Sequence, residues 1–130
     1  MKLIKPLIQF FFLTAILLSG CKTNSTKDKL ARTWVMEDMS GPGAARFPDS
    51  VKREMYGTRY LEFTDEGEMI ATGGKARMQR GDYHISSDGK TIFTTVNGRA
   101  SDTMAINKLT KDTLILLIKK ANLEITWTPK

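Results

Sequence analysis

The chain has 130 residues, a length that fits a single domain. Its 20 basic and 14 acidic residues give a net charge of +6, spread without the aromatic-interleaved basic clusters that bind nucleic acid. A single cysteine excludes an internal disulfide, and a single histidine leaves no imidazole pair to share a metal ion.

Residues 1–20 have the pattern of a bacterial signal peptide. Lys2 and Lys5 precede an apolar run of about 12 residues, too short for a helix that spans a bilayer, which takes roughly 20. Leu18-Ser-Gly-Cys21 resembles the lipobox of bacterial lipoproteins. That resemblance implies cleavage before Cys21 and acylation of its thiol, which would anchor the mature chain to a membrane. The alternative is an ordinary signal peptide followed by a chance cysteine.

Cleavage before Cys21 would remove Lys2 and Lys5 and leave 18 basic against 14 acidic residues, a net charge of +4. Residues 22–29 contain no apolar side chain, so together with Cys21 the sequence predicts a lipidated, flexible tether over 21–29. Lys22 stands where an aspartate would retain a lipoprotein in the inner membrane, under the sorting rule that the resemblance suggests. The expected location is therefore the outer membrane, on either its periplasmic or its surface face.

The domain is expected to begin at Leu30. Residues 30–38 read as a first strand, with Trp34 and Met36 on one face. Three glycine and proline residues at 41–43 predict a loop over 39–48. A short helix is expected over 49–56, and it could close one end of a barrel.

Short apolar segments separated by turn signals fill the rest of the chain. The predicted strands cover 60–63, 69–72, 77–85, 91–96, 104–109, 114–118 and 123–127, which with the first makes eight. Asn97-Gly98 is typical of a type I′ hairpin turn. Turns this regular indicate antiparallel neighbours, and the predicted fold is all-β, an eight-stranded up-and-down barrel with one short helix near 49–56.

Several motifs in this part of the chain resemble the short lipocalin-like lipoproteins of Bacteroidetes. They are Leu30-x-x-Thr-Trp34, the hairpin over 61–67, Gly81-Asp-Tyr-x-Ile85, Asp88-Gly-x-Thr-Ile92 and the passage over 106–114. The resemblance covers residues 30–130 and implies a lipocalin-like barrel with no catalytic residues. Lipocalins usually have glycine two residues before the first-strand tryptophan, where this chain has Arg32. A basic residue near the end of their last strand often covers that tryptophan, and Lys130 is the candidate here.

An eight-stranded barrel is filled by side chains or holds one small ligand. The residues expected to line this lumen, mainly as core, are Trp34, Phe63, Tyr83, Phe93, Met104 and Trp127. Short strands leave too little room for haem or a long lipid. The mouth is expected near the loops at 41–46 and 73–78.

Two functions remain open at this stage, and catalysis is not expected. The first is binding of a small hydrophobic or amphipathic molecule, and the alternative is a packed scaffold or inhibitor that docks an envelope protein. His84 is predicted on the solvent side of its strand, and no motif places a base beside Ser86, Ser87 or Ser101. The acids at 65–68 read as turn residues rather than calcium ligands. The sequence therefore indicates no catalytic residue, metal site, cofactor or nucleic-acid partner.

Overall fold

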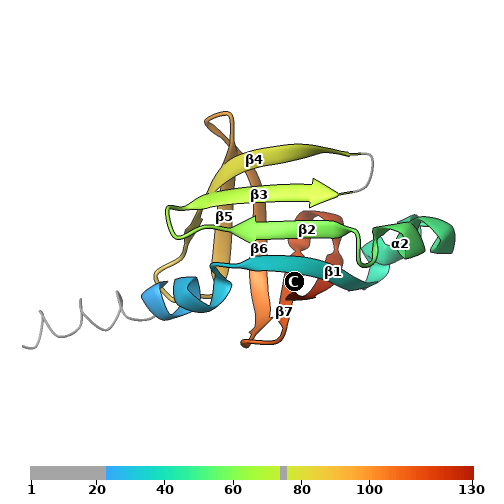
Figure 1. Cartoon of the computed structure of the whole chain (residues 1–130), viewed down its shortest axis with the longest axis horizontal. Coiled ribbons are helices and arrows are strands. Elements are labelled where there is room, and N and C mark those ends of the chain that lie inside the picture. The colour runs from blue at the N-terminus through green and yellow to red at the C-terminus, as the bar shows by residue number, and fades with distance from the viewer. Residues whose placement is uncertain (1–22, 74–75) are drawn as a thin grey trace, which may run out of the picture.

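The structure, a computed structural model, describes residues 23–73 and 76–130 (Figure 1). Eight antiparallel strands close into a barrel in which each strand pairs with its sequence neighbours and β8 pairs with β1. The strands are β1 (Thr33–Ser40), β2 (Arg59–Phe63), β3 (Glu68–Gly73), β4 (Ala76–Ile85), β5 (Thr91–Val96), β6 (Arg99–Leu109), β7 (Leu114–Ile118) and β8 (Leu123–Pro129). The predicted fold class is confirmed.

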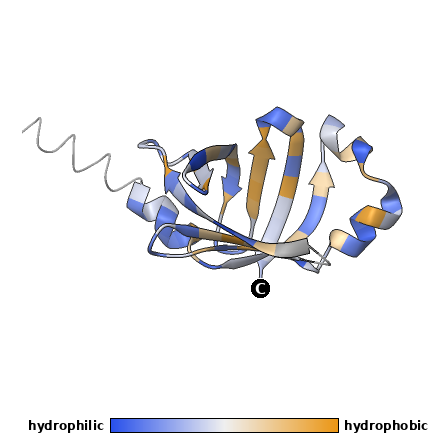
Figure 2. Cartoon of the chain, turned by 90° about the horizontal axis from the view of Figure 1, so that it is seen from above, coloured by the Kyte–Doolittle hydropathy of each residue, from blue (hydrophilic) through white to orange (hydrophobic). Residues whose placement is uncertain are grey.

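Side chains alternate between the lumen and the outer wall, because successive residues of a strand point to opposite faces. Figure 2 shows hydrophobic and hydrophilic residues interleaved along the strands. The buried apolar residues form one core: Leu30, Trp34, Met36, Met39, Ala44, Leu61, Phe63, Tyr83, Ile92, Met104, Leu114, Leu116, Leu123, Ile125 and Trp127. The predicted turn between β5 and β6 has positive φ at both Asn97 (53°) and Gly98 (74°).

A β-bulge in β1 lets two methionines at an odd spacing both face the lumen. The register with β8 shifts between Met36 and Asp38, so Met36 and Met39 are both buried although they are three residues apart. A regular strand would turn one of them outward.

One end of the barrel carries the helix that the sequence predicts. This α2 end is where β1, β3, β5 and β7 finish, and it holds η1 (Pro42–Arg46), α2 (Asp49–Met55) and η2 (Lys119–Ala121). The chain after α2 returns to β1 through Gly57 N–H, which donates to the Met36 carbonyl at 2.9 Å. Gly43 N–H donates to the Asn122 carbonyl at 2.9 Å, which ties η1 to the turn before β8.

The opposite end, here called the capped end, holds a helix over residues 23–30 where the sequence predicted a flexible tether. Figures 1 and 2 both place this helix and α2 at opposite ends of the long axis. The hydroxyls of Thr23 and Thr26 donate to the carbonyls of Ser86 and Gly89, at 3.3 and 3.2 Å. Leu30 closes the helix and is fully buried in the core. The tether prediction is therefore wrong for the residues from 23 onward.

Arg32, the residue that departs from the lipocalin pattern, itself covers the first-strand tryptophan. Its guanidinium lies 5.2 Å from the ring centroid of Trp34 and donates to the Lys111 carbonyl at 2.8 Å. Lys130, the candidate for that position, lies over the Tyr60 ring instead, at 4.7 Å. The expected cation–π contact is present, but it comes from the residue just before β1.

Within 23–73 and 76–130, no helix is both long enough and apolar enough to cross a membrane.

Candidate functional site: a cavity at the α2 end

The half of the barrel near the capped end is filled by aromatic side chains. Trp34 is fully buried and its Nε1–H donates to the Leu30 carbonyl at 3.0 Å. Phe63 and Tyr83 pack edge to face with their ring centroids 5.0 Å apart. This half therefore has the dense packing of a protein core.

Tyr83 is the titratable group of this packed half. Its hydroxyl donates to the Thr64 carbonyl at 2.7 Å. Burial, with a smaller contribution from the negative charge of Asp65, raises the pKa of Tyr83 to about 12. Both causes disfavour the phenolate. The phenol thus stays protonated and serves as a structural hydrogen-bond donor.

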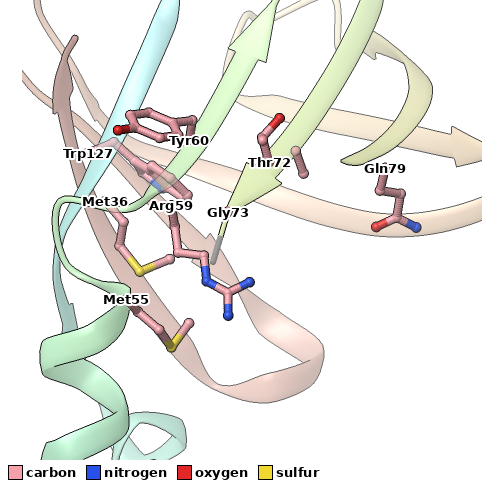
Figure 3. Close-up of a pocket in the computed structure, with 9 residues that line it drawn as sticks. Met36, Met55, Arg59, Tyr60, Thr72, Gly73, Gln79 and Trp127 are labelled. Carbon is pink, nitrogen blue, oxygen red and sulfur yellow. The ribbon is translucent and has the colours of Figure 1, made fainter. Parts of the chain in front are cut away.

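Towards the α2 end the inward side chains of β3 become progressively smaller. The register of β3 with β2 places Met69, Ala71 and Gly73 on the inward face. This taper leaves a cavity of about 220 Å³. Figure 3 shows the residues that line it, which are Met36, Met55, Arg59, Tyr60, Ala71, Thr72, Gly73, Gln79 and Trp127.

Arg59 is the one charged residue that the described part of the chain contributes to this lining. It is the register partner of Gly73 and has the same inward parity as Leu61 and Phe63. A Cβ atom on Gly73 would lie 2.4 Å from Cδ of Arg59 and 2.8 Å from its Cα. The arginine stem therefore occupies the space that any larger residue at position 73 would take.

Two buried donors of the lining have no acceptor among the described residues. They are Nε of Arg59 and Nε1 of Trp127. Trp127 as a whole is only 7% exposed. A buried donor without an acceptor costs free energy, so it favours any water or ligand that brings one. The cavity thus combines apolar walls with two enclosed donors that lack an acceptor within the described chain.

Five of the six residues expected in the lumen are buried: Trp34, Phe63, Tyr83, Met104 and Trp127. Of these, Trp127 alone lines the cavity, and the other four are packed core. The prediction for Phe93 is wrong. Its side chain is 37% exposed on the outer wall and stacks on His84 with ring centroids 5.0 Å apart.

Sequence reasoning placed the loop at 73–78 near the mouth, but as lining residues it missed Met36, Met55, Arg59, Tyr60, Ala71, Thr72 and Gln79. A signal for Arg59 was present: it stands two and four residues before Leu61 and Phe63, so a strand that buries those two also points Arg59 inward. The facing small residues carried no such signal, because their alignment depends on the register of two strands.

A second hollow lies on the outer wall. It has a volume of about 270 Å³ and is lined by Thr33, Tyr60, Glu62, Ile70, Thr72 and Lys130. These are outward-facing side chains of β1, β2 and β3 and the last residue of the chain. The two buried donors without acceptors in the described chain both belong to residues that line the first cavity, inside the barrel at the α2 end (the lumen cavity). The lumen cavity is therefore the better candidate site.

Over the described ranges, no three histidine, cysteine, aspartate or glutamate side chains gather to hold a metal ion. Ser86 donates to the Asp88 carboxylate at 2.5 Å within the β4–β5 turn, and this bond is the main cause that lowers the pKa of Asp88. Both residues thus have a structural role in that turn. Cys21, the predicted lipidation site, lies outside the described residues.

Comparison with known proteins supports the fold. No family model matches the chain, and no curated protein matches it. A solved structure of a DUF4847 family protein from Bacteroides vulgatus is similar, with a TM-score of 0.53 and 12% sequence identity. The alignment covers 77% of this chain and 93% of that chain. At this identity the similarity shows a shared barrel fold and nothing about activity.

Proposed function

We propose that this chain is a non-catalytic binding protein that holds one small amphipathic molecule at the α2 end of its barrel. The supporting observation is the cavity, whose apolar walls surround two buried donors without acceptors. Ligand sites are typically concave, mostly apolar and furnished with a few polar groups. The volume of about 220 Å³ is small, since an engineered cavity of about 150 Å³ holds benzene. The ligand should therefore have at most about ten non-hydrogen atoms.

The same proposal includes a lipid anchor at Cys21 and a place in the bacterial outer membrane. The lipobox-like segment and Lys22 support it. Thr23, the first described residue, contacts the turn at the capped end, and two peptide units span at most about 7 Å. A lipid on Cys21 would thus hold the capped end near the membrane and leave the cavity at the far end of the barrel.

A cavity-filling substitution tests the binding proposal. Ala71→Leu adds three carbons to the inward face of β3 and should abolish binding while the barrel stays folded. Ala105→Leu is the matched control, because Ala105 alternates with the buried Met104 and faces the outer wall. Saturation-transfer NMR with amphipathic fragments of six to ten non-hydrogen atoms measures both. Fragments that bind wild type and Ala71→Leu alike, or a complete lack of binding, would refute the proposal.

A different observation favours the second candidate, an envelope interaction scaffold. Phe93 lies on the outer wall, stacked on His84, although an aromatic residue gains more from burial in the lumen. Phe93→Ser would then weaken capture of a partner by the membrane-bound protein and leave fragment binding unchanged. Unchanged capture would argue against this candidate.

A further inference from the structure

The charge of Arg59 narrows the class of ligand that the cavity can accept. Among the described residues, its lining contains no aspartate or glutamate. The salt bridge observed within the described chain joins Arg80 to Glu68 at 2.9 Å, on the outer wall, and does not involve Arg59. Arg59 is half-buried with its Nε enclosed, and the partial loss of water around a guanidinium favours an anionic partner. The site therefore presents one positive charge that no described side chain neutralises.

Steric constraints hold that charge at the cavity. The stem of Arg59 packs against the Cα of Gly73, where a Cβ atom would clash. Figure 3 shows the guanidinium extending from the stem towards the open side of the cavity, with Gln79 farther away across the opening. A side chain held in this way loses less conformational entropy when it binds an anion than a free surface arginine does. The guanidinium is thus preorganised for the head group of a ligand that enters from the α2 end.

We propose that the ligand is a small carboxylate with an apolar body, whose carboxylate pairs with Arg59 while the body lies against Met36, Met55 and Ala71. A planar carboxylate matches the fork of guanidinium donors. This inference rests on the proposed binding function and adds the chemistry of the head group.

Comparing hexanoate with 1-hexanol distinguishes the affinity that the head group contributes from the affinity that the apolar body contributes. Both compounds carry a six-carbon chain, and only hexanoate is charged at neutral pH. The full-length chain in detergent micelles, labelled with ¹⁵N, is titrated with each compound, and the indole and arginine side-chain signals are followed. The chain has two tryptophans. The indole signal of Trp127 should move, whereas that of Trp34, bonded to Leu30, should stay and so report any effect of the detergent.

Hexanoate should bind roughly tenfold to a hundredfold more tightly than 1-hexanol, the range expected of hydrogen bonds to a charged group. Arg59→Met should remove most of that preference, measured as the ratio of the two affinities in the same variant, and Arg59→Lys should restore part of it. Arg80→Met is the matched control, because it removes the same charge from the outer wall, where Arg80 pairs with Glu68. That variant should bind hexanoate as wild type does.

Equal affinity of wild type for the two compounds would overturn the carboxylate inference and leave the binding function standing. A preference that survives Arg59→Met, or one that Arg80→Met removes, would overturn it as well. If neither compound moves the Trp127 signal and the fragment set also fails to bind, both proposals fall. The comparison in wild type decides the matter even if Arg59→Met does not fold.

Discussion

Arg59 shows how one position on a strand determines the chemistry of a cavity. Its parity with Leu61 and Phe63 turns it inward, and its register partner Gly73 leaves room for its stem. A long polar side chain at the end of a strand can place its stem on the core and its charge at the edge, an arrangement common for arginine. The same residue one position later would have pointed to solvent.

Tyr83→Phe tests the buried phenol. The pKa of Tyr83 is raised from 10.0 to about 12, so its protonated form contributes stability that is complete below pH 10 and is lost as the pH rises through about 12. Tyr83→Phe should cost about 1 kcal/mol at pH 7, because the bond to the Thr64 carbonyl is lost. The difference in stability between wild type and variant should shrink above pH 10. Urea unfolding of both proteins from pH 7 to 11.5 measures it, and a constant difference would contradict the prediction.

The position of Phe93 could not be predicted from residue types alone. Ile92 and Phe93 are both large and apolar, so either parity of β5 buries one of them. The structure buries Ile92 and, with it, Thr94. The Thr94 hydroxyl donates to the Asp102 carbonyl at 2.8 Å and accepts from the Asp102 N–H at 2.9 Å. These two hydrogen bonds to the next strand make a buried threonine acceptable, and the pattern of β5 alone does not reveal them.

Among the elements, most strands and α2 were predicted close to their observed bounds. β6 begins at Arg99, five residues earlier than predicted, and the helix over residues 23–30 was not predicted. Strands can be predicted from the alternation of apolar and polar residues and from the turn residues between them, which are local signals. The helix has no apolar stripe, because residues 23–29 are all polar. Its observed hydrogen bonds to the barrel come from two threonine hydroxyls, and its terminal Leu30 is buried. The sequence of an element that docks through hydroxyl groups has the same polar composition as a flexible linker.

Thr23→Val together with Thr26→Val tests this docking. Valine keeps the shape of threonine and has a similar helix propensity, so the change removes little besides the two hydroxyls. Each lost bond should cost about 1 kcal/mol. Hydrogen exchange of the amides over 27–32 should therefore speed up, while exchange in β5 and β6 stays the same. Thr103→Val, on the exposed part of β6, is the control and should leave every helix amide unchanged. Unaltered exchange in the double variant would show that the helix is held by other contacts.

For the whole molecule, barrel closure could be predicted and the cavity could not. Regular turns and period-two strands leave sheet edges that closure removes, so the sequence indicates a barrel directly. The free space depends on which inward residues face one another across strands, such as Gly73 and Arg59. Pairing of this kind is a property of the register and only becomes visible in three dimensions.

Cys21→Ser tests the anchor. If Cys21 carries the lipid, the variant should move from the membrane fraction to the soluble fraction or accumulate with its leader uncleaved, because two or more acyl chains are needed for firm attachment. Lys22→Ala is the control and should remain in the membrane fraction. Fractionation of the native host and the mass of the mature protein report both outcomes. A native protein whose thiol is unmodified would refute the anchor.

The taper from Met69 through Ala71 to Gly73 has an evolutionary consequence. At position 73 a Cβ atom would clash with the backbone of Arg59, so the residue there is confined to glycine. Position 71 has no such constraint, and exchanges at that position could lengthen, shorten or eliminate the space for a guest molecule while the barrel persists. Homologous chains with the same architecture are expected to differ in the ligand they bind according to the residue at position 71.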